Sequence, residues 1–115
     1  MASEPLIVEQ EVPGVLRLRG PLTMENLPSF QNAVRREATP TIFLDLTEVP
    51  YVDSAGLGSL VSAYISRHKS GQRVVLSGVN DRVLKLFEIT RVEPLFLIFP
   101  TLGDAIGALL NSGSA

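Results

Sequence analysis

The transition from a strand to a helix lies in the sequence Tyr51-Val52-Asp53-Ser54-Ala55-Gly56-Leu57-Gly58. It follows the apolar run Ile42-Phe43-Leu44-Asp45-Leu46, which is rich in strand-forming residues. After it, apolar residues recur at helical spacing: Leu57, Leu60, Val61, Tyr64 and Ile65. Ser54 is therefore expected at a strand-to-helix junction, where its side-chain oxygen is predicted to cap free backbone N–H groups. A phosphate on this serine would meet the positive end of the helix dipole.

The composition predicts one compact domain over residues 1–115. Of the 115 residues, 45% are hydrophobic and 19% are charged, which is enough apolar surface for a core. The formal charge of -2 has no basic block behind it, so we expect no nucleic-acid partner. The absence of cysteine excludes thiol catalysis, thiolate metal sites and disulfides. No apolar run approaches the roughly 20 residues of a bilayer span, so the sequence predicts a soluble, cytoplasmic protein without membrane insertion. It does not specify an oligomeric state.

The N-terminal third is predicted to hold a hairpin and a helix. Two apolar segments, 6–10 and 15–19, flank Pro13-Gly14, a dipeptide typical of a turn. The charged residues of the hairpin are expected on an outward face: Glu9, Glu11, Arg17 and Arg19. Thr23 is expected to cap a helix over about 24–37. Its apolar face comprises Leu27, Phe30, Ala33 and Val34.

Strands and helices alternate in the rest of the chain. The predicted elements are strand 42–46, helix 55–70 ending at Gly71, strand 74–77, helix 81–89 capped by Asn80, strand 95–99, and helix 102–111 with Thr101 and Asp104 in a capping-box-like relation. Residues 111–115 are expected to form a flexible, polar tail. The alternation predicts an α/β fold with a mixed, mostly parallel sheet, opened by the antiparallel hairpin and accompanied by about four helices.

These motifs resemble the STAS domain, the module of anti-sigma factor antagonists and of the cytoplasmic end of sulphate transporters. The resemblance rests on Leu44-Asp45-Leu46 leading through Val52-Asp53-Ser54-Ala55-Gly56-Leu57-Gly58 into the next helix. Gly71, the strand near Val74 and the run Val83-Leu84-Lys85-Leu86-Phe87 support it. It covers nearly the whole chain and implies a single STAS-like domain.

The resemblance implies a phosphorylation switch. In the antagonist family, the serine directly after this aspartate is phosphorylated by the partner, an anti-sigma factor that is also an ATP-dependent serine kinase. By position, that serine is Ser54. Unphosphorylated members bind the anti-sigma factor and release the sigma factor, whereas phosphorylated members let go. Two residues depart from many relatives: Ala55 replaces a second hydroxyl residue, and Thr23 replaces an acidic residue in a loop presented near the acceptor.

A partner-binding surface is therefore expected around the acceptor serine. Its predicted members are Thr23, Tyr51, Val52, Asp53, Ser54, Ala55, Gly56, Leu57 and Gly58. Gly56 and Gly58 lack side chains, which would let a partner approach the start of the helix closely. Tyr51, Val52 and Leu57 are interpreted as lining the partner-facing surface, although all three could equally cover the core.

The remaining polar and glycine residues are interpreted as structural and not as ligands of a cofactor. Asp53 either positions a kinase-bound metal or braces the loop through bonds to backbone N–H groups, and the brace is favoured. Gly56-Leu57-Gly58 lacks the third glycine of a dinucleotide loop, because Val61 stands in its place. His68, the one histidine, is interpreted as a solvated or dipole-capping residue. No cofactor or metal site is expected.

Three other functions compete with the switch. A phosphoacceptor receiver domain would use Asp45, but it needs an acidic pair after the first strand and a lysine after the last, and neither is present. An enzyme is not expected, because the usual acid, base and nucleophile sets cannot be assembled. The third is a non-phosphorylated STAS adaptor subunit of a signalling scaffold or a membrane transporter complex, and it stays open.

Overall fold

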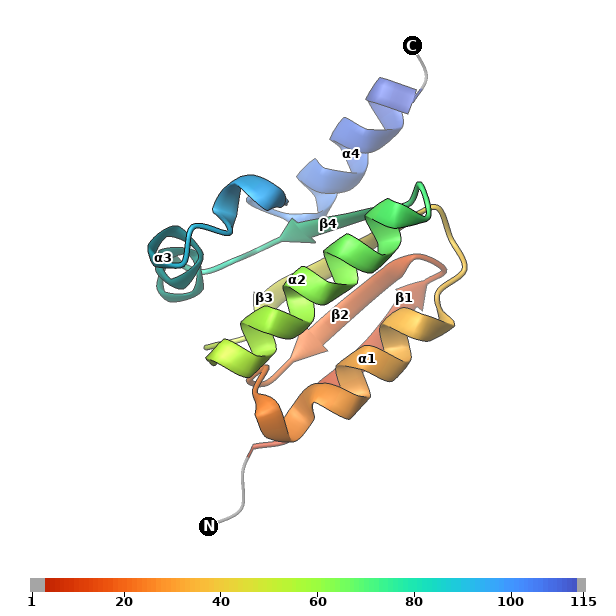
Figure 1. Cartoon of the computed structure of the whole chain (residues 1–115). Coiled ribbons are helices and arrows are strands. Elements are labelled where there is room, and N and C mark those ends of the chain that lie inside the picture. Colours follow the sequence, from red (N-terminus) through yellow and green to blue (C-terminus); the bar gives the residue numbers. More distant parts are fainter. Residues whose placement is uncertain (1–3, 114–115) are drawn as a thin grey trace.

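The computed structural model describes residues 4–113, which form one five-stranded sheet with helices around it (Figure 1). The strands lie in sequence order, β1 to β5. The first two are antiparallel and all later neighbours are parallel, which confirms the predicted mixed sheet. The elements are β1 (Ile7–Val12), β2 (Val15–Arg19), η1 (Met24–Asn26), α1 (Leu27–Arg36), β3 (Thr41–Glu48), α2 (Ser54–Lys69), β4 (Arg73–Ser77), α3 (Asp81–Ile89), η2 (Glu93–Leu95), β5 (Leu97–Phe99) and α4 (Leu102–Gly113).

The main core lies between the sheet and two helices, α1 and α2, which run side by side across it (Figure 1). Alternate strand residues point to this layer because side chains alternate between the two faces of a strand. They are Leu16, Leu18, Ile42, Leu44, Leu46, Val74 and Leu76. Phe30 of α1 and Leu60 of α2 are fully buried against them. The fourth helix, α4, contacts β3, β4 and β5 and buries Ala105.

The opening hairpin agrees with its prediction. Gly14 has φ +88 in the turn, where a side chain would be strained. The charged residues form ion pairs along the hairpin: Arg17 with Glu11 at 3.1 Å, Arg17 with Asp45 at 3.3 Å, and Arg19 with Glu9 and Glu48, each at 3.3 Å. All but Asp45 have substantially exposed side chains, so these pairs add little to stability.

Three predicted elements have different bounds in the structure. The helix expected over 24–37 is split into η1 and α1, with a proline in the first turn of α1, and Thr23 makes no side-chain cap bond. The strand expected over 95–99 is shortened because Pro94 lies in the 3-10 turn η2. The tail predicted at 111–115 begins inside α4, which runs to Gly113, and its last two residues lie outside the described part.

A buried arginine joins α2 to the end of α1, which the sequence pattern did not indicate. Arg67 is 8% exposed and donates hydrogen bonds to the backbone carbonyls of Val34 and Glu37. It also donates to the side chain of Gln72 at 3.2 Å. The carbonyls at the end of a helix lack intrahelical partners, so Arg67 satisfies groups that would otherwise be buried unpaired.

Replacing Arg67 with methionine is expected to lower the free energy of unfolding by about 2–4 kcal/mol, because several buried acceptors lose their donor. Lys69→Met is the matched control: Lys69 lies exposed on the same last turn, and its loss should cost less than about 0.5 kcal/mol. Urea denaturation of both variants gives the comparison, and equal stabilities would contradict the assigned role of Arg67.

Candidate functional site

The loop after β2 is bound along its length to the segment that enters α2. Leu22 and Val52 form a parallel β-bridge. The amide of Leu22 donates to the carbonyl of Tyr51, and the amide of Asp53 donates to the carbonyl of Leu22, each at 3.2 Å. These bonds place Thr23 beside the start of α2, so the two parts of the predicted site lie next to each other.

Asp53 caps the N-terminus of α2. One carboxylate oxygen accepts a hydrogen bond from the amide of Gly56 at 2.7 Å, and the other accepts from the amide of Met24 at 3.1 Å. The interpretation of Asp53 as a brace is confirmed, since its two bonds hold the loop and the helix together. The prediction that Ser54 caps the helix is wrong. The extended residue before the helix is Asp53, and Ser54 is already the first helical residue.

The Ser54 side chain is exposed at the first position of α2. Its hydroxyl makes no hydrogen bond to any other residue in the described range 4–113. Because Asp53 supplies the cap, the Ser54 hydroxyl is not needed to satisfy the backbone N–H groups at the start of α2. It is accessible to another protein.

Several neighbours of Ser54 belong to the core and not to the surface. Val52 and Leu57 are 8% and 6% exposed, so the prediction that their side chains line a partner-facing surface is wrong. Gly56 is also buried. A Cβ there would lie 2.1 Å from the carbonyl oxygen of Leu22, so this glycine permits close packing within the chain and not the approach of a partner.

The predicted residues that remain at the surface are Ser54 and Gly58, with Tyr51, Asp53, Ala55 and Thr23 half-buried. A Cβ built on Gly58 would meet nothing within 4 Å, so the surface above it is open. The surface around Ser54 thus includes fewer residues than the motif predicted, because Val52, Gly56 and Leu57 are buried.

A hollow of about 440 Å³ lies beside the start of α2, between the 51–53 segment and α3. Asn80 holds α3 in this position by donating from its side-chain amide to the carbonyls of Val49 and Pro50, at 3.1 and 3.3 Å. The Arg82 guanidinium lies 5.2 Å from the centre of the Tyr51 ring, a cation–π contact. The α3 residues that line the hollow are Arg82, Val83, Lys85, Leu86 and Ile89.

Two exposed apolar side chains flank the capping residue. Met24 is 70% exposed, and its amide is bound by Asp53. Ile89 is 68% exposed and lines the hollow that Asp53 also lines. Both side chains therefore leave large apolar surface exposed near Asp53. Sequence analysis missed both residues and Arg82, because only tertiary contacts bring η1 and α3 to the start of α2.

Other chemistry finds little support in the described residues. Asp45 is buried and accepts hydrogen bonds from Arg17 and from both the amide and the hydroxyl of Thr47, so its carboxylate is engaged within the fold. Within residues 4–113, no group of three His, Asp or Glu side chains could hold a metal ion. None of the helices in that range has the length and apolar content that a bilayer span needs.

Replacing Asp53 with alanine is expected to destabilise the domain by about 1–2 kcal/mol, because the helix loses its cap and the loop loses its tie to Met24. Asp53→Asn should cost roughly half as much, since the amide oxygen still accepts one of the two bonds. Thermal and urea unfolding would measure both changes. An alanine variant as stable as the original would exclude Asp53 as the brace.

Comparisons with known proteins identify the family of the chain. A family model described as the STAS domain matches residues 4–105. The chain belongs to the STAS domain family. This STAS domain is 42% identical over 64 residues to the anti-sigma-B factor antagonist of Listeria monocytogenes, a match that spans 56% of each chain. It is 30% identical over 83 residues to the anti-sigma-B factor antagonist of Staphylococcus aureus, covering 70% of this chain and 77% of that one.

Solved structures share the fold of this STAS domain. A Thermotoga maritima protein (TM1081) assigned as an anti-sigma factor antagonist superimposes with a TM-score of 0.77 at 27% identity, over 90% of this chain and 92% of that one. A sulfate transporter family protein from Wolinella succinogenes gives 0.77 at 21% identity, over 88% and 87%. Bacillus SpoIIAA in its phosphorylated form gives 0.65 at 18% identity, over 90% and 98%. The last two likenesses concern the fold alone.

Proposed function

We propose that this STAS domain is an anti-sigma factor antagonist that binds a serine-kinase anti-sigma factor in the cytoplasm and is switched off by phosphorylation of Ser54. The names of the Listeria and Staphylococcus relatives support the antagonist role. The phosphorylated form of SpoIIAA supports a phosphorylation switch on this fold. The domain itself acts by binding and not as an enzyme.

One observation carries the proposal: the Ser54 hydroxyl is exposed and unbound, while the adjacent Asp53 does the capping. A hydroxyl that capped the helix would lose its bond on phosphorylation, and the helix would weaken. In this domain Asp53 caps the helix, and Ser54 is the proposed acceptor. Modification of Ser54 therefore leaves the hydrogen bonds of Asp53 in place, and the modified domain stays folded.

The added charge acts mainly on the complex. A phosphoserine carries about 1.5 to 2 negative charges. The helix N-terminus favours that charge by about 0.3–1 kcal/mol, and the neighbouring Asp53 carboxylate opposes it. In an interface the same charge must lose its water, which costs several kcal/mol without a matching cation. Desolvation is the larger effect, so phosphorylation ejects the partner.

The surface that we assign to the partner centres on Ser54 and Gly58. Met24 and Ile89 supply apolar contact, and the half-buried Tyr51, with Arg82 over its ring, forms a wall of the hollow between the 51–53 segment and α3. Thr23 and Ala55 complete this patch, and Asp53 supports it from below. Val52, Gly56 and Leu57 contribute through the core that holds it in place.

Incubation with ATP and the candidate anti-sigma factor kinase, followed by intact-mass measurement, tests the proposal. We expect a gain of one phosphoryl group on the original protein and none on Ser54→Ala. Phosphorylation that persists in Ser54→Ala would contradict the assigned acceptor.

A second candidate function is the adaptor subunit of a signalling scaffold or transporter complex. The fold shared with the Wolinella sulfate transporter family protein supports this alternative. The same incubation separates the two. Stable stoichiometric association with no gain in mass would favour the adaptor and count against the switch.

A further inference from the structure

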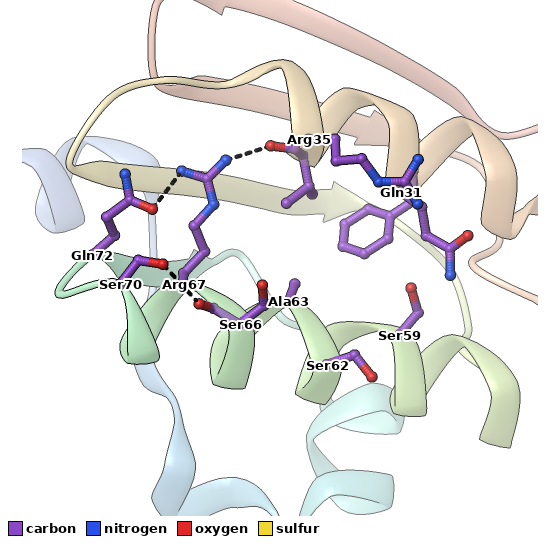
Figure 2. A pocket seen from close by; sticks show the side chains of 11 residues that line it. Gln31, Arg35, Ser59, Ser62, Ala63, Ser66, Arg67, Ser70 and Gln72 are labelled. Carbon is purple, nitrogen blue, oxygen red and sulfur yellow. Dashed lines mark hydrogen bonds between the residues drawn. The ribbon is translucent and has the colours of Figure 1, made fainter.

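A groove of about 340 Å³ lies between α1 and α2 (Figure 2). Its volume falls within the lower part of the range of small-molecule sites, roughly 300–1,000 Å³. The residues that line it are Phe30, Gln31, Val34, Arg35, Ser59, Ser62, Ala63, Ser66, Arg67, Ser70 and Gln72. None of them belongs to the partner surface around Ser54.

The groove contains a buried hydroxyl without a hydrogen-bond partner. Ser59 is 7% exposed, and its Oγ makes no hydrogen bond within residues 4–113. Figure 2 shows this hydroxyl pointing from α2 toward α1, into the space between the helices. A buried polar group of this kind costs stability unless something satisfies it. A water or a bound molecule in the groove has the position to supply this bond.

The rest of the lining defines the chemistry of that molecule. Ser59, Ser62 and Ser66 lie at helical spacing on one face of α2, so they form a row of hydroxyls that donate and accept. Phe30 and Ala63 give the groove an apolar floor. At the rim, Figure 2 shows Arg35 extending along α1 beside Gln31.

The charge of the groove is positive. Its lining includes two arginines and no aspartate or glutamate. Arg67 is already occupied by the carbonyls of Val34 and Glu37. Arg35 is exposed, and it donates through one nitrogen to Asn32 at 3.3 Å, which leaves further N–H groups of its guanidinium free to bind an anion.

We propose that this groove binds a small hydroxylated organic anion, such as a polyol or sugar that carries one phosphate or carboxylate group. The anionic group lies at Arg35, the hydroxyl groups pair with the serine row, and the carbon skeleton rests on Phe30. The site is independent of the Ser54 switch, and it lies on the same helix.

Amide-resolved NMR titrations of the full chain test this proposal with four probes: glucose 6-phosphate, gluconate, glucose and inorganic phosphate. We expect glucose 6-phosphate or gluconate to shift the amide signals of Gln31, Ser59 and Ser62. Comparing these two probes shows whether the groove prefers a phosphate or a carboxylate group. Glucose and inorganic phosphate should bind at least about fivefold more weakly, because each lacks one half of the recognised chemistry. No shifts along α1 and α2 with either organic anion, or equal binding of glucose, would overturn the proposal.

Matched variants assign the binding to this groove. Ser59→Ala should weaken binding about fivefold, whereas Ser77→Ala should not, because Ser77 is also a buried hydroxyl without a partner but does not line the groove. Arg35→Gln should weaken binding of the anions by a similar factor, and its exposed neighbour in Arg36→Gln should not. Ser62→Leu, at an exposed position, should block the groove and abolish binding. Equal effects within either matched pair would place the probe elsewhere.

Discussion

Replacing Ser54 with aspartate is expected to weaken binding to the proposed partner, a serine-kinase anti-sigma factor, by more than about tenfold, while the melting temperature changes little. The carboxylate must lose its water when the partner covers the start of α2. In the free domain it stays exposed, and the hydrogen bonds that Asp53 makes to Gly56 and Met24 are not disturbed. Calorimetric titration measures the affinity, and a thermal melt measures the stability.

Ser54→Ala separates charge from the loss of the hydroxyl. It removes the acceptor without adding charge, so its affinity should stay within about threefold of the original, since one exposed hydroxyl contributes little. If alanine weakens binding as much as aspartate does, the hydroxyl is a contact residue and electrostatic ejection is not the mechanism.

Replacing Gly56 with alanine is expected to destabilise the domain by at least about 2 kcal/mol, despite the better helix propensity of alanine. The new Cβ would lie 2.1 Å from the carbonyl oxygen of Leu22 and 3.0 Å from a methyl group of Val52. The backbone of Leu22 cannot give way without breaking its bonds to Tyr51 and Asp53, so the entire start of α2 must shift.

Gly58→Ala is the matched control, two residues further along the same helix. Nothing lies within 4 Å of a Cβ at this position, so alanine should stabilise the domain by about 0.5–1 kcal/mol. Urea denaturation should therefore move the two variants in opposite directions. If Gly56→Ala also stabilises the domain, the result would contradict the close approach of α2 to the carbonyl oxygen of Leu22.

The alternation of strands and helices could be predicted because periodicities of 2 and 3.6 are strong signals. They indicated β3, β4, α2 and α3, and Asn80 was identified as the cap of α3, where it accepts from the amide of Val83 at 2.8 Å. The choice between Asp53 and Ser54 as the cap of α2 could not be made from sequence. Both residue types cap helices well, and the bond from Met24 to Asp53 joins residues 29 positions apart.

The surface around Ser54 was only partly predictable, for a similar reason. The motif indicated Ser54 as the proposed acceptor. An apolar residue after a strand fits either the core or an interface, and the structure buries both Val52 and Leu57. The contributions of Met24 and Arg82 depend on where η1 and α3 pack. Arg67 could not be identified either, since a basic residue near a helix end usually lies in solvent and this one extends to the end of another helix.

Binding of the enzymatically phosphorylated protein is the measurement that bears most directly on the proposed switch at Ser54. Calorimetry with the anti-sigma factor would compare the unmodified protein, the phosphorylated protein and the same sample after phosphatase treatment. We expect the unmodified protein to bind tightly and the phosphorylated protein to bind more than about tenfold more weakly. Phosphatase treatment should restore the full affinity. Equal affinity in the first two samples, with the phosphate confirmed on Ser54 by mass, would contradict the proposed role of its exposed hydroxyl.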